Sequence, residues 1–106
     1  MALEVVWADR ALDKLRTILE RVSEDRPAAA VALIDRLFDR AAALAAHPQL
    51  GRRYEPAPDA GLRELVEGRY RLIYRVDPER AQVQIVAIRH ERERELPREE
   101  LAAEER

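Results

Sequence analysis

The strongest constraint on the fold is the order of its periodic segments. Two long segments with helical periodicity are followed by short segments with strand periodicity. Apolar residues recur at spacings of three and four in residues 8–25, and an alanine-rich apolar face runs through residues 26–47 after Pro27, as in amphipathic helices. Asp9 is the expected N-cap of the first helix, and residues 23–26 join the two segments. The pattern predicts an antiparallel helical hairpin.

Three later segments alternate apolar and polar residues and are separated by turn signals at Gly68 and Pro78. They are residues 62–66, 69–76 and 81–90. We expect these strands to form an antiparallel meander, with the last one central because it is apolar on both sides. Residues 3–7 add an N-terminal strand, and residues 49–61 are expected to be a loop. The predicted class is α+β, in the order β-α-α-β-β-β, with the helices on one sheet face.

The two last strands divide their side chains between the two faces of this sheet. In residues 69–76, alternation places Tyr70, Leu72, Tyr74 and Val76 toward the core and Arg69, Arg71, Ile73 and Arg75 on the reverse. In residues 81–90 it places Val83, Ile85 and Ala87 on one face and Val86 and Ile88 on the other. Helices on one face leave the reverse uncovered, so we expect the arginines to be exposed there. They either pair with acids such as Glu64 across strands or meet an acidic partner.

The sequence also indicates where the aromatic residues outside these strands should lie. Trp7 and Phe38 lie on the apolar faces of their segments, and we expect both in the core. Tyr54 lies in the predicted loop, where the sequence leaves its role open.

Length and composition exclude several classes of protein. The 106 residues fit one domain, which we place at residues 1–97, with a charged tail at residues 98–106. No apolar run approaches the ~20 residues of a membrane helix, and no signal-like segment follows Met1; we expect a cytoplasmic protein without a membrane partner.

The titratable residues argue against a metal site and against general nucleic-acid binding. The chain has no cysteine and only two histidines, which lie far apart and lack ligand spacing, so no metal or other cofactor is expected. The net charge is −2 and residues 61–90 carry six arginines against four acids. That excess is too small for a general nucleic-acid binder, and we expect no direct sequence-specific DNA binding by the chain alone.

Four stretches, in this order and spacing, resemble the RelE/ParE superfamily of toxins from bacterial type II toxin–antitoxin modules. They are VVWADRALDKL, EDRPAAAVALIDRLFDRAAALAAHPQLGR, GLRELVEGRYRLIYRVD and VAIRHERERELP. The resemblance spans residues 3–97. It implies a toxin held inactive by a cognate antitoxin encoded beside it. In the RelE branch the activity is cleavage of mRNA in the ribosomal A site, and in the ParE branch the target is DNA gyrase.

The RelE branch requires a set of nuclease residues. A metal-free ribonuclease needs a base, an acid and cations that stabilise the phosphorane. By resemblance, Arg71 falls on the branch's strand arginine, Arg63 lies near its lysine-bearing strand, and Arg92 matches the arginine after the last strand. The branch's C-terminal tyrosine is missing, because none follows Tyr74. His90 is the only group there with an ordinary pKa suited to neutral acid–base work, although the sequence favours a strand cap bonded to a backbone carbonyl over catalysis.

The ParE branch resembles this chain more closely, through LRELVEGRYRLIYRV and the ending IRHERE. The sequence therefore favours a ParE-like toxin that binds DNA gyrase and has no active site of its own. Its expected partner contacts are Arg63, Arg69, Arg71, Arg75, Arg89 and Arg92. One alternative is a ribosome-dependent mRNA endoribonuclease that uses Arg71, His90 and Arg92 in catalysis. The other is a homologue that binds an antitoxin but is not toxic.

Overall fold

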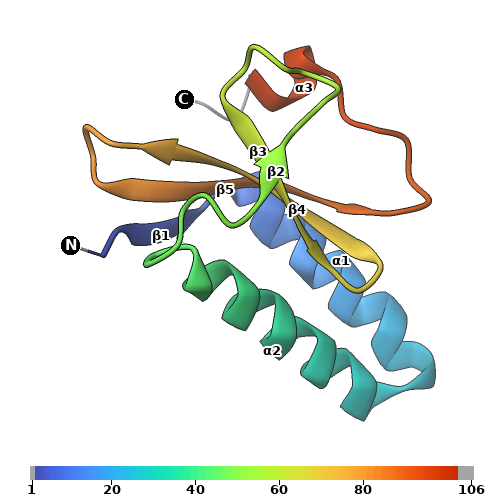
Figure 1. Cartoon of the computed structure of the whole chain (residues 1–106). Coiled ribbons are helices and arrows are strands. Elements are labelled where there is room, and N and C mark those ends of the chain that lie inside the picture. Colours follow the sequence, from blue (N-terminus) through green and yellow to red (C-terminus); the bar gives the residue numbers. More distant parts are fainter. Residues whose placement is uncertain (1, 103–106) are drawn as a thin grey trace.

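The computed structural model describes residues 2–102 and contains one mixed sheet with a helical hairpin against one face (Figure 1). The elements are β1 (Glu4–Trp7), α1 (Asp9–Asp25), α2 (Pro27–Ala43), β2 (Arg52–Arg53), β3 (Leu62–Glu67), β4 (Tyr70–Asp77), β5 (Gln82–His90) and α3 (Arg98–Ala102). The strand order is β1-β5-β4-β3-β2, with β1 parallel to β5 and the other pairs antiparallel. The α+β class and the meander are confirmed, and the last strand is interior as expected, although β4 and not β5 is the middle strand of the five. The sequence analysis did not predict β2.

The two long helices bury one stripe each against the sheet. In α1 the buried residues are Ala11, Leu15 and Ile18, at the spacing that keeps side chains on one helix face. The helix begins at Asp9, and the N-cap is Ala8, which makes no side-chain cap. The prediction of Asp9 as N-cap is therefore wrong. Its carboxylate lies in the first turn, where its negative charge interacts favourably with the helix dipole.

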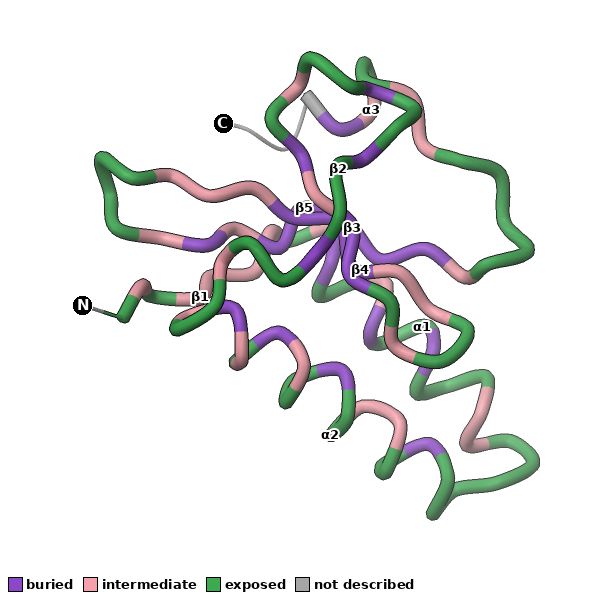
Figure 2. Tube along the Cα trace, viewed as in Figure 1, coloured by how far each residue is buried: buried purple, intermediate pink, exposed green. Residues whose placement is uncertain are grey.

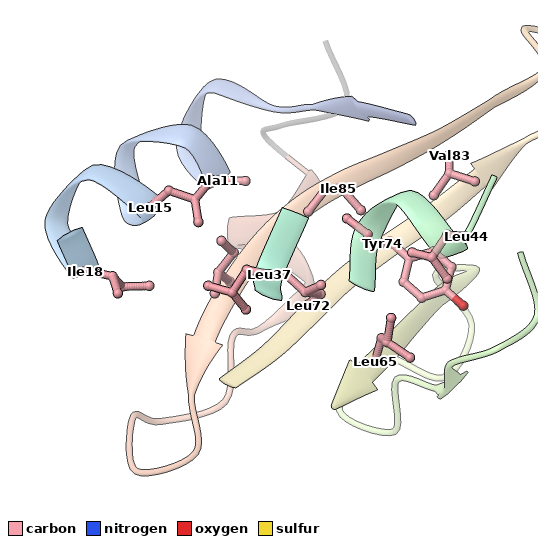
Figure 3. Packing of buried hydrophobic residues seen from close by; sticks show 12 residues of the cluster. Ala11, Leu15, Ile18, Leu37, Leu44, Leu65, Leu72, Tyr74, Val83 and Ile85 are labelled. Carbon is pink, nitrogen blue, oxygen red and sulfur yellow. The ribbon is translucent and has the colours of Figure 1, made fainter. Parts of the chain in front are cut away.

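The main core lies between this hairpin and the sheet. It contains Ala11, Leu15, Ile18, Leu37, Ala41, Leu44, Leu65, Leu72, Tyr74, Val83, Ile85 and Ile88 (Figure 3). Trp7 packs against this cluster and meets Phe38 with a ring-centroid distance of 5.0 Å. The Phe38 side of that contact faces outward, because the residue is 41% exposed. The prediction that Phe38 is a core residue is thus wrong.

The fully buried Tyr74 ties the loop after α2 to the sheet. Its hydroxyl donates to the carbonyl of Pro48 at 2.7 Å and accepts from the amide of Gly51 at 2.9 Å, so the phenol buries no unsatisfied polar atom. Gly51 is required here, since a Cβ would lie 2.7 Å from the carbonyl oxygen of Glu64. The tyrosine therefore fixes where the loop meets the sheet edge.

A β-bulge in β5 changes which face its later residues occupy. Ile73 pairs with Ala87 and Tyr74 with Ile85, which leaves Val86 as an extra residue. Ile88 therefore joins the helix-side cluster, and both Val86 and Ala87 join the reverse side. The strict alternation predicted for this strand fails after Ile85.

The reverse face of the sheet is covered at its centre, unlike the open surface predicted from the sequence. A second cluster there contains Tyr54, Ala57, Leu62, Ile73, Val86, Ala87 and Leu101. The loop before β3 and the short α3 supply its outer layer, and both lie across the sheet from α1 and α2 in Figure 1. The burial along the chain follows this division, with buried segments in the strands and exposed turns between them (Figure 2).

The C-terminal segment is attached to this second cluster. The Tyr54 hydroxyl donates to the Leu96 carbonyl at 2.8 Å and accepts from the Leu96 amide at 2.9 Å. Residues 98–102 of the expected charged tail form α3, in which Leu101 is only 1% exposed. The rest of that tail, residues 103–106, lies outside the described residues.

Within residues 2–102, no helix combines the length and apolar character needed to cross a membrane.

Candidate functional site

The residues predicted to bind a partner or to act in catalysis divide between the two faces of the sheet. Tyr70 packs with the helix-side cluster and is paired with His90, so both lie on the helix side of the hairpin formed by β4 and β5. Arg71 is paired with Arg89 and lies on the opposite side, because neighbouring residues of a strand alternate. Arg69, Arg71 and Arg75 share the reverse face with Ile73, as the strand pattern predicted.

Arg69 and Arg71 both approach Glu91 at one end of the reverse face. Their guanidinium nitrogens lie 4.0 and 3.8 Å from the Glu91 carboxylate oxygens. Arg71 also donates to the carbonyls of Gly68 and Tyr70, both at 3.1 Å, and its side chain is only 17% exposed. Arg69 is 67% exposed. Arg69 is thus the surface cation of this pair, while Arg71 mainly holds the turn.

Arg75 lies toward the other end of the same face. Its Nε and one terminal nitrogen both donate to Gln84 Oε1, at 3.2 and 2.7 Å. It lies four positions along the strand from Arg71, which is about 13 Å. The fully buried Ile73 lies between them beneath the second cluster. The arginines of the reverse face therefore flank a covered apolar centre and do not form one continuous patch.

Arg89 is inside the molecule. One terminal nitrogen lies 3.7 Å from Glu64 Oε2, and these side chains are 10% and 6% exposed. The other donates to the Glu93 carbonyl at 2.8 Å. Its Nε has no hydrogen-bond partner within the described residues. Arg89 thus holds the chain that leaves β5, and it offers a partner almost no surface in this conformation, unlike the contact predicted for it.

Arg63 lies on the helix side of the sheet, near its edge. It is paired with Tyr74 across the strands, and one terminal nitrogen donates to the Gly51 carbonyl at 2.7 Å. Glu64, the next residue, points to the reverse face and also binds Arg52 at 3.0 Å. Arg63 therefore supports the loop that Tyr74 anchors, and it is separated from the other predicted contacts.

His90, Tyr70 and Arg92 come together at the helix-side end of β5. The backbone amide of Arg92 donates to His90 Nδ1 at 3.1 Å. The rings of Tyr70 and His90 meet edge to face, with centroids 5.1 Å apart. Burial raises the pKa of Tyr70, and the Glu93 carboxylate adds to this. The imidazole thus accepts a hydrogen bond from a backbone amide, whereas the capping interpretation expected it to bond to a backbone carbonyl.

The structure does not bring the three predicted nuclease residues together. His90 and Arg92 line one pocket beside α1, while Arg71 points to the reverse face and contacts Glu91. Among residues 2–102, no three histidine, aspartate or glutamate side chains form a group that could hold a metal ion.

Residues of α1 that the sequence analysis assigned no role share the pocket of His90 and Arg92. They are Lys14, Thr17, Ile18, Arg21 and Val22. The polar members recur at spacings of three and four along the helix, which places them on one line. This line of polar residues could have indicated a functional helix face. Nothing in the sequence showed that the end of β5 lies against it.

The element order and the sheet topology define the class as a RelE/ParE-type toxin fold. A chain of the chromosomal ParDE system from P. aeruginosa superposes with a TM-score of 0.72 at 20% identity, over 84% of this chain and 96% of that one. A chain of the RelBE2 toxin–antitoxin complex from Mycobacterium tuberculosis gives 0.64 at 22% identity, over 85% and 92%. A mutant of the E. coli toxin RelE in the free state gives 0.61 at 18% identity, over 98% and 94%.

The family follows from the sequence itself. The chain belongs to the ParE toxin family of type II toxin–antitoxin systems, whose model, described as the ParE toxin of the parDE system, matches residues 5–95. No curated protein gives a significant match.

Proposed function

We propose that this toxin inhibits DNA gyrase in the cytoplasm and is neutralised by a cognate antitoxin. The family match over residues 5–95 carries the proposal, since gyrase is the target that resemblance to the ParE branch implies. The position of Arg71, on the opposite face from His90 and Arg92, supports a binding protein over a nuclease.

The exposed arginines are the proposed contacts with acidic partners. Arg69 and Arg92 are exposed, and Arg63, Arg71 and Arg75 are partly exposed at separate places on the sheet. Arginine binds carboxylates through paired, charge-assisted hydrogen bonds. A charged antitoxin segment that folds on binding would satisfy these groups, and a strand added to an edge of the sheet would supply backbone hydrogen bonds.

The decisive measurement is supercoiling by purified gyrase with the toxin alone and with toxin plus antitoxin. We expect the toxin to inhibit supercoiling and the antitoxin to restore it. Arg69→Glu and Arg92→Glu should weaken inhibition, whereas Arg80→Glu, at the tip of the turn between β4 and β5, should not. Unaffected supercoiling at toxin excess would rule the proposal out.

A second candidate function is supported by one observation. His90, Arg92 and Tyr70 bring an imidazole, a guanidinium and a phenol into the same pocket, which are groups able to transfer protons and bind phosphate. Cleavage of ribosome-bound mRNA that disappears in His90→Ala would establish the nuclease. Absence of cleavage would eliminate it.

The remaining candidate is a homologue that binds its antitoxin without toxicity. Expression of the chain alone in a bacterium separates this case from both others. We expect arrested growth, and normal growth at confirmed expression would favour the non-toxic homologue.

A further inference from the structure

The pocket between α1 and the helix-side end of β5 has the size and lining of a ligand site. Its volume is about 530 Å³, within the range of pockets that hold small organic molecules. Ile18 and Val22 supply an apolar wall, and Tyr70 and His90 supply two rings. The pocket is therefore suited to a compact ligand with an apolar or aromatic part.

The charge of this pocket is positive and only partly neutralised from within. Lys14 Nζ lies 2.7 Å from both carboxylate oxygens of Glu93, so these two lining charges neutralise each other. Arg21 and Arg92 also line the pocket. Within residues 2–102, neither guanidinium has an ion-pair or hydrogen-bond partner. Two cations remain without a counter-charge, which is the electrostatic requirement for an anion site.

The segment that carries Arg92 is held in place before any ligand arrives. The His90 amide donates to the Glu93 carboxylate at 2.8 Å, and the Arg92 amide donates to His90 Nδ1 at 3.1 Å. Because Nδ1 accepts this bond, the neutral ring carries its proton on Nε2, which is left as a donor. The turn thus presents a guanidinium and an imidazole N–H from a fixed backbone.

We propose that this pocket binds a compact organic phosphate monoester, with the phosphate between Arg21 and Arg92 and the organic part against Ile18, Val22 and Tyr70. This pocket lies on the helix side, away from the reverse-face arginines proposed as partner contacts, and Arg92 is the one proposed contact that also lines it. Two guanidinium groups and an imidazole N–H match the several oxygens of one phosphate. A nucleoside monophosphate has the required combination of a phosphate and a flat apolar group.

An acidic peptide is the competing ligand for a basic pocket. A peptide binds along an extended groove or a sheet edge through repeated backbone contacts, whereas this pocket is lined by α1, Tyr70 and the end of β5 with the turn after it, and by no residue of the edge strands β1 and β2. The apolar wall and the two rings would be left uncovered by a carboxylate side chain. The lining therefore favours the phosphate monoester.

The test is a titration of the full-length protein with adenosine monophosphate, followed by NMR or calorimetry. We expect saturable binding, with shifts at Tyr70 and His90. Arg21→Gln and Arg92→Gln should each weaken binding at least about tenfold, which corresponds to the loss of one charge-assisted hydrogen bond. Arg80→Gln is the matched control, because it removes an exposed arginine at the far hairpin turn and should leave binding unchanged.

Three further probes identify the ligand class. Adenosine should bind at least about tenfold more weakly than its monophosphate, because it lacks the anion. Inorganic phosphate should also bind more weakly, because it lacks the organic part. A tetraglutamate peptide that binds as tightly as the monophosphate would overturn the assignment, as would monophosphate binding that survives both arginine substitutions. Arg21 in α1 and Arg92 in the turn after β5 are both exposed. Circular dichroism would confirm that each variant is folded.

Discussion

The two faces of the sheet are stabilised by different kinds of interaction. The helix side is built on an apolar cluster, and the buried Tyr74 hydroxyl within it makes two hydrogen bonds. The reverse side has a smaller cluster, a buried Arg89–Glu64 pair and a C-terminal segment bound through Tyr54. Apolar packing is sensitive to lost volume, whereas the reverse side depends on a few polar partners, and we expect the segment on it to open locally before the rest unfolds.

The largest effect should come from the helix side. Leu72 is fully buried in the centre of that cluster, so Leu72→Ala should lower the free energy of unfolding by about 4 kcal/mol, through lost transfer energy and an unfilled cavity. Urea denaturation measures this. Leu50→Ala is the control, since Leu50 is 47% exposed, and it should cost about 0.5 kcal/mol or less. A Leu72→Ala loss as small as the control would break the comparison.

Removing one partner of the reverse-side ion pair should have the next largest effect. Arg89→Met leaves the buried Glu64 carboxylate with only Arg52, and we expect a loss of about 3 kcal/mol. Combined with Glu64→Leu, the loss should be smaller than in Arg89→Met alone, because no uncompensated charge remains. A double-mutant cycle by urea denaturation checks this. Simple additivity would show that the pair is not coupled.

Loss of the Tyr54 hydroxyl should loosen the C-terminal segment more than the whole molecule. Tyr54→Phe removes both hydrogen bonds to Leu96, at a cost of about 1 kcal/mol. Hydrogen exchange in residues 93–101 should accelerate, while β4 and β5 remain protected. Tyr70→Phe is the control, because its hydroxyl makes no hydrogen bond within residues 2–102. Uniform acceleration throughout the chain would contradict a separate, detachable segment.

The smallest effect should be a pH-dependent one at Glu93. Burial acts to raise the pKa of this carboxyl, but Lys14 and the His90 amide outweigh burial and hold the pKa below its ordinary value of 4.5. A carboxyl with a lowered folded-state pKa stabilises the fold above the unfolded value and loses that contribution as the pH falls through the folded value. Glu93→Gln should therefore cost less than about 1 kcal/mol near neutral pH, since the group is partly solvated.

That difference should shrink toward zero in strong acid. Urea denaturation of the wild type and of Glu93→Gln at about pH 7 and about pH 3 measures it. Glu20→Gln on the exposed side of α1 is the control. A loss of equal size at both pH values would mean that Glu93 acts through packing and not through its charge.

Periodicity predicted the elements whose partners lie next to them in sequence. The helical hairpin and the meander follow from spacings of 3.6 and two residues, and these local signals were correct. The bulge was missed because Val86 and Ala87 are both apolar, so the pattern gives no sign of which of them is the extra residue. Without the bulge, Arg89 would face the helices, and its pairing with Glu64 on the reverse side depends on that single insertion.

The reverse side and the α1 pocket depend on contacts between distant residues. The segment after β5 offers only Leu96 and Leu101 as apolar anchors, and their partners lie more than forty residues earlier, around Tyr54. No local pattern reports such a contact. The pocket shared by Arg21 and Arg92 is missed for the same reason, since a helix face and the end of a distant strand meet only in the folded chain.

The parallel pairing of β1 with β5 has a consequence for synthesis. Glu4 is paired with Gln82 and Trp7 with Ile85, so the first strand waits for the last one while the chain is being made. A nascent or clipped product that stops before residue 82 lacks β5, which joins β1 to the rest of the sheet, and contacts so distant in sequence form late. The five-stranded sheet therefore cannot be completed before β5 is translated, and we expect shorter fragments to be more open to proteases.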